Sequence, residues 1–318
     1  MKIVLIAPGY KPFPPNGWGA VESIVWDYYQ NLLKRGHDVN IVNRSNPAEI
    51  IAETNAIEPV PDIVHIMYDD HIVVAPYLRC CKKVLYTSHY AYITHPEFAT
   101  NYVWYFKNIF MRVIEYQRYI TINVISNQIE AVYRKYGFQG KINVLCNGAR
   151  EDCFRYTEEP NLSNKSAYVA KVENRKKQYL YQGITNIDFI GNYHDSPFNT
   201  KSPNYLGEWN KPTLYHGLTD YANLVLLSDG EADPLVVKEA LIAGLGVVLS
   251  ECACANLDLS LPFITVIPDN KRADLDYVKR EIIRNRLASL KNRSEIRAYG
   301  LSNFAWNTII DKYEQILI

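Results

Sequence analysis

The stretch SDGEADPLVVKEALIAGLGVVLSE, from Ser228 to Glu251, decides the fold class of this chain. The run that leads into it, ANLVLLS at 222–228, is short and apolar, so it predicts a buried strand. Pro234 suits the first turn of a helix because it lacks an N–H group, and apolar residues at helical spacing continue to Gly244, a typical helix stop. The segment GVVLS at 246–250 then predicts the next strand. The stretch is therefore interpreted as a β-α-β unit.

This unit holds two glutamates, Glu231 at the start of the helix and Glu239 inside it. Eight helical residues rise about 12 Å, whereas the acid and nucleophile of a glycoside hydrolase lie roughly 5–9.5 Å apart. A hydrolytic pair is therefore not expected here. Two glutamates beside a helix N-terminus suit separate hydroxyl groups of an extended ligand whose phosphates meet the helix. Taken alone, two such glutamates are more typical of solvated surface charges.

The composition is that of a soluble globular chain with room for two domains: 318 residues, 48% hydrophobic, 21% charged, with a net charge of +0. Neutrality argues against bulk attraction to nucleic acid or anionic lipid. The first apolar run, in MKIVLIAPGYKP, is too short for a signal peptide and predicts a strand. Later apolar runs fall short of the ~18–20 residues of a membrane span. The expected location is the cytoplasm.

The cysteines form no C-x-x-C pair and lie in or beside predicted strands, so we expect them to be reduced, mostly buried and not bound to a metal. They are Cys80, Cys81, Cys146, Cys153, Cys252 and Cys254.

Short apolar segments alternate with helical ones in two series, which predicts two doubly wound α/β domains with parallel sheets. The expected strands of the first series are Lys2–Pro8, Asp38–Asn43, Asp62–Met67, Lys83–His89, Thr121–Asn127 and Lys141–Asn147. Those of the second series are Ala167–Val172, Ile187–Asn192, Asn204–Trp209, Ala222–Ser228, Gly246–Ser250 and Ile264–Pro268. The polar stretch Arg155–Ser166 is the predicted linker. We place the first domain at 1–157 and the second at 158–300. A helix is expected at 301–318, within the amphipathic segment 294–318. This helix either packs back on the first domain or caps the second.

In the segment Pro14–Val42, the loop after the first strand contains Gly17 and Gly19, which would allow unusual backbone angles and close approach of a ligand. An amphipathic helix is expected from Ala20 to just before Gly36. Backbone N–H groups at its start could hold a phosphate or a sugar oxygen. The pattern is not a dinucleotide fingerprint, because G-x-G-x-x-G is incomplete, and an ordinary surface loop is the alternative.

Three further side chains lie where predicted strands end. Lys171 ends a strand and Lys176 follows after a polar turn, where two cations could neutralise a diphosphate. His89, in the segment YTSHY, ends the predicted strand Lys83–His89. Each residue alone is more typical of a solvated turn or a structural histidine.

Together these segments resemble retaining glycosyltransferases of the GT-B fold, family 4 type, over nearly the whole chain. The most specific part is E-A-D-P-L-V-V-K-E followed by A-L-I-A-G, which resembles the E-x7-E motif of that family. PPNGWGAVES with KRGHDV resembles its N-terminal glycine motif and helix, and SHY its strand-end histidine. VLCNGAREDCF at 144–154 and AKVENRKK resemble the segments before and after its hinge.

The resemblance implies a role for each matched residue. Glu239 would hold the ribose hydroxyls of a nucleotide-sugar, and Glu231 the hydroxyls of the donor sugar. Lys171 and Lys176 would stabilise the departing diphosphate, and His89 would contact the sugar near the reacting carbon. The residues implied in donor binding are Gly19, Asp233, Pro234, Leu235, Val236 and Glu239.

The same resemblance implies the reaction: transfer of a hexose from a UDP- or GDP-sugar to a hydroxyl acceptor with retention, in glycan or glycolipid synthesis. It implies no metal ion and no cofactor, since the nucleotide-sugar is a substrate. The partners would be the donor and a glycan, lipid-linked or other hydroxyl acceptor, with no nucleic acid.

The chain departs from the family pattern at four matched positions. Ala20 and Ala232 stand where glycines are usual, and Lys171 replaces an arginine, which loses the bidentate fork. Asp233 replaces an aromatic residue beside the expected donor sugar. The departures at Ala20 and Asp233 leave open a non-catalytic binder of nucleotide-sugars. A nucleotide-sugar epimerase on the same fold, which would need catalytic carboxylates, is a second alternative.

The acceptor side is marked only by the segment 98–120, FATNYVWYFKNIFMRVIEYQRYI, which mixes aromatic residues with Lys107, Arg112 and Arg118. Aromatic residues at helical spacing usually belong to the core, and this is the favoured interpretation. A peripheral contact with a membrane, where a lipid-linked acceptor would lie, is the alternative.

Overall fold

The computed structural model describes residues 1–15 and 19–318. Its contacts divide the chain into two compact units. The first unit contains residues 1–147 and 309–318, and the second contains residues 148–308. The chain thus passes between the units twice, near residues 148 and 309.

The first unit has a parallel sheet whose strand order over the described residues is β2-β1-β3-β4-β5-β6. The strands are β1 (Lys2–Ala7), β2 (Asp38–Asn43), β3 (Ile63–Ile66), β4 (Lys83–Thr87), β5 (Thr121–Val124) and β6 (Ile142–Val144). Its helices are α1 (Ala20–Lys34), α2 (Pro47–Asn55), α3 (Tyr102–Tyr105), α4 (Met111–Glu115) and α5 (Asn127–Lys135), with a π-helical segment, Phe106–Phe110, joining α3 to α4. Strands β1 and β3 are buried along nearly their whole length, as expected of a sheet covered on both faces.

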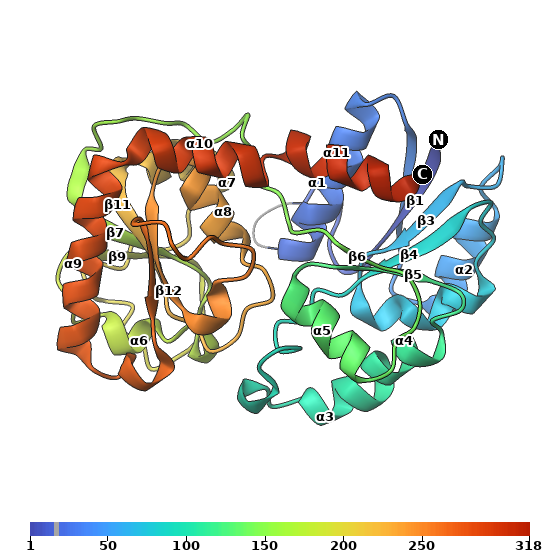
Figure 1. Cartoon of the computed structure of the whole chain (residues 1–318), viewed down its shortest axis with the longest axis horizontal. Coiled ribbons are helices and arrows are strands. Elements are labelled where there is room, and N and C mark those ends of the chain that lie inside the picture. The colour runs from blue at the N-terminus through green and yellow to red at the C-terminus, as the bar shows by residue number, and fades with distance from the viewer. Residues whose placement is uncertain (16–18) are drawn as a thin grey trace. The chain divides into compact units, whose positions relative to one another are not determined.

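The second unit has a parallel sheet with the order β13-β12-β11-β7-β9. Its strands are β7 (Leu162–Val169), β9 (Ile187–Ile190), β11 (Tyr221–Leu226), β12 (Gly246–Ser250) and β13 (Ile264–Ile267), beside a small pair, β8 (Val172–Glu173) and β10 (Tyr193–Asp195). Its helices are α6 (Gln178–Tyr181), α7 (Lys211–Gly217), α8 (Leu235–Ile242), α9 (Leu275–Lys291) and α10 (Arg293–Phe304), and α11 (Trp306–Leu317) follows. Helices α8 and α9 both pack on β11 and β12, and Figure 1 shows them on opposite sides of these strands. Two doubly wound parallel α/β domains are therefore confirmed.

The β-α-β unit predicted from the opening stretch is present as β11, α8 and β12. β11 and β12 pair in parallel register, with Asn223 opposite Gly246. Pro234 is the N-cap of α8, and Gly244 follows the helix with φ +84°, a left-handed conformation that favours glycine. Glu231 precedes the helix and Glu239 lies one turn inside it.

The predicted strand Asn204–Trp209 is wrong. This segment meets the sheet at a single bridge, between Tyr205 and Phe189 of β9. Backbone hydrogen bonds to the β9 region follow the segment as far as Gly207, whose carbonyl accepts from the Gly191 N–H at 2.8 Å and whose φ of +70° ends the extended backbone there.

Several strand boundaries also differ from the prediction: β4 ends at Thr87, for example, so His89 follows this strand rather than ending it. β7 ends at Val169, so Lys171 follows the strand rather than ending it. β7 also begins at Leu162, inside the predicted linker Arg155–Ser166, because the strand starts with exposed polar residues that resemble a loop in sequence.

The segment Ser294–Ile318 forms two helices, α10 and α11, and not one. Ala305 between them is extended, with ψ 140°. The carboxylate of Glu151 accepts hydrogen bonds from the backbone N–H groups of Trp306 (2.9 Å) and Asn307 (3.3 Å), so it caps the start of α11. A residue distant in sequence therefore fixes the break.

Helix α11 completes the core of the first unit with residues 309–318. Ile309, Ile310, Tyr313 and Leu317 are fully buried. On its polar side, Glu314 contacts His37 at 2.9 Å.

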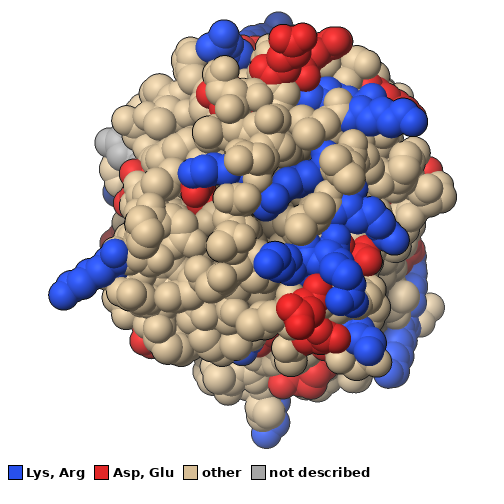
Figure 2. Space-filling view, turned by 90° about the vertical axis from the view of Figure 1, so that its left-hand side faces the viewer, with Lys and Arg blue, Asp and Glu red and all other residues tan. Residues whose placement is uncertain are grey.

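The surface carries charges of both signs. Figure 2 shows one side of the molecule, where Lys and Arg side chains gather together with Asp and Glu. Helix α9 carries exposed Lys279, Arg280 and Arg284, and Arg284 pairs with Glu281 at 2.8 Å.

The cysteines are free thiols, but only Cys252 is buried, so the expectation of mostly buried thiols is wrong. Cys81 is exposed and the others are half-buried. Among the described residues, no helix is both long and apolar enough to span a membrane.

Candidate functional site

The strand order of the second unit marks where a ligand would bind. From β7 the chain goes first to β9 on one side and then to β11 on the other, so the topological switch lies between β7 and β11. Ligands of open parallel sheets bind beyond the carboxyl ends of the strands at such a switch. The loops after these two strands carry Lys171, Lys176 and Glu231.

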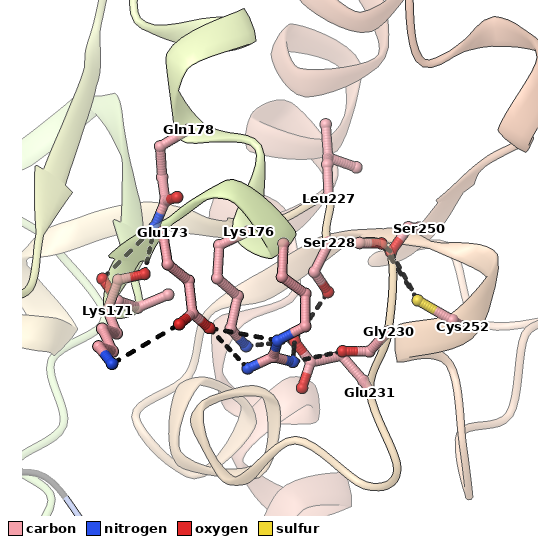
Figure 3. A network of polar contacts seen from close by, with 12 residues as sticks. Lys171, Glu173, Lys176, Gln178, Leu227, Ser228, Gly230, Glu231, Ser250 and Cys252 are labelled. Atoms are coloured by element: carbon pink, nitrogen blue, oxygen red, sulfur yellow. Dashed lines mark hydrogen bonds and ion pairs between the residues drawn. The ribbon is translucent and has the colours of Figure 1, made fainter. Parts of the chain in front are cut away.

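These loops form a group of interacting charges that we call the helix-mouth cluster: Lys171, Glu173, Arg175, Lys176, Ser228 and Glu231 (Figure 3). At its centre, the ammonium group of Lys176 donates to the Glu231 carboxylate. The Ser228 hydroxyl donates to the same oxygen at 2.7 Å, and Arg175 Nη1 lies 3.6 Å from it. Glu231 and Lys176 are only 7% and 9% exposed, so this pair is shielded from solvent.

Both central groups have shifted pKa values. Burial alone would raise the pKa of Glu231, but the charges of Lys176 and Arg175 outweigh it and hold this pKa below its usual value. Burial lowers the pKa of Lys176, and the attraction of Glu231 offsets this effect in part. The pair is therefore an ionised carboxylate held by a buried ammonium group.

Arg175 links the centre of the cluster to its edge. Its Nη1 donates to the Gly230 carbonyl at 2.5 Å, and its Nη2 donates to Glu173 at 2.9 Å. Glu173 also lies 3.7 Å from the Lys171 ammonium group, as the dashed line between them in Figure 3 marks. Cations therefore outnumber carboxylates at the helix mouth, which suits a polyanionic ligand.

The N-terminus of α8 adds backbone donors beside the cluster. Pro234 provides no side-chain cap, so the first N–H groups of the helix, at Leu235 and Val236, are those that an anion would meet. Glu239 is half-buried on the same helix, about 6 Å along its axis from Leu235. The structure thus places Glu231 and Glu239 on either side of the helix start.

Asp233 lies in this loop, but its carboxylate points inward. It forms an ion pair with Lys238 of α8, and both side chains are fully buried. Asn256 Nδ2 also donates to it at 2.9 Å, and the Lys238 ammonium lies 5.6 Å from the centre of the Phe304 ring. The charge that the departure at Asp233 introduces is therefore neutralised within the unit.

In the first unit, His89 follows β4 and is held by a buried carboxylate, Asp69. Asp69 accepts hydrogen bonds from the His89 backbone N–H (3.0 Å), the Ser88 hydroxyl (2.5 Å) and the hydroxyls of Tyr86 and Tyr105 (both 3.1 Å). Burial raises the pKa of Asp69, and these donors oppose the shift. Asp69 follows β3, and the topological switch of this sheet lies between β1 and β3.

The N-terminal glycines are only partly described, because Gly17 lies outside the described residues. Gly19 is the N-cap of α1 and has φ −171°, an extended backbone open to any residue, so the expected unusual angle is wrong. A Cβ atom would lie 2.6 Å from Glu22 Oε2 and 3.1 Å from Lys11 Nζ, but both atoms end flexible side chains that can shift, so the surrounding space does not require glycine either.

Four residues of these clusters are not predicted from the sequence: Arg175, Ser228, Asp69 and Lys238. Arg175 directly precedes Lys176, Ser228 ends the predicted strand before Glu231, and Asp69 lies shortly after the predicted strand Asp62–Met67. Lys238 gives no signal of its own, because its partner is known only once α8 is folded.

The comparisons with known proteins rest on structure. No protein-family model matches the sequence, and no curated protein matches it. HepE from Anabaena, solved in complex with UDP-glucose, superposes with a TM-score of 0.72 at 16% sequence identity over 99% of each chain. Sucrose-phosphate synthase from Thermosynechococcus elongatus gives 0.76 at 14% identity, over 99% of this chain and 98% of that chain. AviGT4, a glycosyltransferase involved in avilamycin A biosynthesis, gives 0.65 at 14% identity, again over 99% and 98%.

The fold is GT-B. This confirms the expected fold class over nearly the whole chain. At these identities the likeness concerns architecture, and the roles of individual side chains rest on the geometry of the helix mouth.

Proposed function

We propose that this protein is a retaining glycosyltransferase of family 4 type, which moves a hexose from a UDP- or GDP-sugar to a hydroxyl acceptor in glycan or glycolipid synthesis. The observation that carries the proposal is the helix-mouth cluster, which lies beyond the switch-point strands of a GT-B fold. The UDP-glucose bound to HepE supports a donor of this class.

The chemistry follows from where charge accumulates. As the bond between the sugar and the diphosphate breaks, negative charge develops on the diphosphate, and preorganised cations stabilise it. We assign this role to Lys171 and Lys176, together with the N–H groups at Leu235 and Val236. Glu231 orients the sugar, and His89 contacts the sugar near the reacting carbon.

At the nucleoside end of the donor, we assign recognition to Glu239, which would accept hydrogen bonds from the ribose hydroxyls. Pro234 and Asp233 shape the loop between the two glutamates, and Gly19 would offer backbone N–H groups. Since the Asp233 carboxylate is bonded to Lys238, its contribution to donor binding is through the backbone.

The test is donor binding by calorimetry with UDP and GDP. Glu239→Ala is expected to weaken the binding of the accepted nucleotide about tenfold or more, because two hydroxyl contacts are lost. Glu295→Ala, at an exposed position of α10, is the matched control and is expected to leave the affinity unchanged. Equal affinities for both variants would remove the ribose assignment.

Turnover distinguishes the reaction from its alternatives. With a panel of nucleotide-sugars and hydroxyl acceptors, we expect release of the nucleoside diphosphate and a glycoside of unchanged anomeric configuration, also in the presence of EDTA. An epimerised nucleotide-sugar without transfer would indicate an epimerase. Binding without transfer or hydrolysis would indicate a non-catalytic binder.

For the acceptor side, we propose a peripheral contact with membranes through the outer face of the helix that spans 102–115. Its core face buries Tyr105 and Phe110, as the favoured interpretation expected. Its outer face exposes Val103 and Trp104, at 67% and 55%, beside the exposed Lys107. Sedimentation with anionic vesicles tests this, and equal sedimentation of wild type and Trp104→Ser would contradict it.

We also propose that the reaction takes place in the cytoplasm.

A further inference from the structure

The helix-mouth cluster poses a problem for the proposed reaction. Lys176 is expected to neutralise the donor diphosphate, yet its ammonium group is bonded to Glu231. Both side chains are nearly excluded from solvent. If Lys176 turned toward a phosphate, it would leave a buried carboxylate without its cation, which is strongly unfavourable.

Arg175 lies where it could replace Lys176 as the cation beside the Glu231 carboxylate. Its Nη1 lies 3.6 Å from the same Glu231 oxygen that Lys176 contacts. A small movement of the guanidinium would therefore bring Nη1 within hydrogen-bonding distance of that oxygen. The guanidinium has five donors, and the Gly230 carbonyl and Glu173 hold it at the edge of the carboxylate. It can therefore approach Glu231 without giving up either anchor.

The backbone around both cations is fixed. The carbonyl of Arg175 accepts from the Asp229 N–H at 2.9 Å, and that of Lys176 accepts from the Tyr168 hydroxyl at 2.5 Å. Tyr168 in turn accepts from the Leu227 N–H at 2.9 Å. The side chains can thus exchange partners while the loop stays attached to β11.

We propose that Arg175 is a positioning residue that takes over Glu231 when Lys176 turns from that carboxylate to the diphosphate of a bound nucleotide. Ser228 stays bonded to Glu231 throughout, so the carboxylate keeps its orientation toward the donor sugar. The inference rests on the proposed function and adds a division of labour: Lys176 serves the phosphate, and Arg175 keeps the glutamate in place.

A double-mutant cycle on the full chain tests this, with UDP or GDP, whichever the wild type binds, as the calorimetric probe. Arg175→Gln alone is expected to weaken nucleotide binding about tenfold. In a Glu231→Gln background, where Lys176 has no carboxylate to release, the same change is expected to alter affinity less than about twofold. Arg175→Lys keeps the charge and is expected to recover part of the loss.

The control is Arg284→Gln, whose side chain is 73% exposed on α9 of the same unit. Melting temperatures of all variants show whether they are folded. An equal loss from Arg175→Gln in both backgrounds would mean that Arg175 contacts the phosphate itself, and this overturns the exchange. A changed melting temperature with unchanged nucleotide affinity would mean a structural role only, which also overturns it.

Failure of the proposed function has a different signature. If the wild type binds none of the nucleoside diphosphates or their sugars, the reaction and the exchange both fall. If it binds and transfers while the cycle shows no coupling, only the exchange falls.

Discussion

Glu231 and Lys176 are 55 residues apart in the chain, yet they form the centre of the candidate site. The sequence pattern places Glu231 at the start of a helix and Lys176 after a polar turn that follows a strand, which is enough to single them out. It could not show that they contact each other, because that contact depends on β7 and β11 being neighbours in the sheet. The same holds for Arg175, whose position beside Lys176 gave no hint of its approach to Glu231.

At the residue scale, Lys176→Ala is expected to lower kcat about 10²- to 10³-fold, since leaving-group stabilisation is lost in the transition state. Lys279→Ala, at an exposed position of α9, is the matched control. Steady-state kinetics with the preferred donor measure both. A variant at position 176 with wild-type turnover would remove the leaving-group role.

The pair Asp233 and Lys238 makes a separate prediction. Lys238→Met is expected to lower the free energy of unfolding by about 3–5 kcal/mol, because it leaves a buried carboxylate without its cation. The double variant Asp233→Asn with Lys238→Met is expected to recover most of that loss. Urea denaturation measures both, and equal stability of the single and double variants would contradict the pairing.

At the scale of elements, the β-α-β unit around α8 was predicted well because its signals are local: apolar runs, Pro234 and Gly244. The wrong predictions concern features that depend on residues distant in the sequence. The break between α10 and α11 depends on Glu151, and Asn204–Trp209 reaches the sheet at one bridge only. Asp69 was missed for the same reason, since its donors come from β4 and α3.

Strand β3 carries His65, which connects three elements of the first unit. Its Nδ1 lies 2.9 Å from the Tyr313 hydroxyl of α11, and its Nε2 lies 2.8 Å from Thr87 Oγ1 of β4. Burial, and then the nearby His89, lower the pKa of His65 to about 3. The folded state therefore keeps this imidazole neutral where the unfolded chain protonates it.

This difference in the pKa of His65 predicts that the free energy of unfolding depends on pH. Between the unfolded pKa of about 6.5 and the folded value, the unfolded chain binds the extra proton, so stability falls as pH falls. The contribution of His65 to the loss between pH 7 and pH 5 is about 2 kcal/mol. Hydrogen exchange of β3 and β4 measures it: His65→Gln should show a smaller pH dependence, and His194→Gln, at an exposed position, should match wild type. Identical pH slopes in all three proteins would contradict the assignment.

At the scale of the whole molecule, the first unit is built from both parts of the chain. The fragment 1–147 lacks the four fully buried side chains of α11. Their burial stabilises by about 6–12 kcal/mol, comparable with the entire stability of a domain. We therefore expect this fragment alone to lack cooperative unfolding.

A peptide of residues 305–318 is expected to restore cooperative unfolding of the fragment, as followed by near-UV circular dichroism. The same peptide with Ile310→Ser and Tyr313→Ser is the control and should not. A fragment 1–147 that unfolds cooperatively by itself would show that α11 is dispensable.

The position of α11 also has a consequence for biosynthesis. On the ribosome, residues 1–147 emerge long before residues 309–318, so the nascent first unit must wait with its apolar surface uncovered while the second unit is being translated. The second unit can finish folding during that interval, whereas the first reaches its native core only when α11 has left the exit tunnel. Chaperone dependence in the cell should therefore concentrate on the half of the protein that is made first.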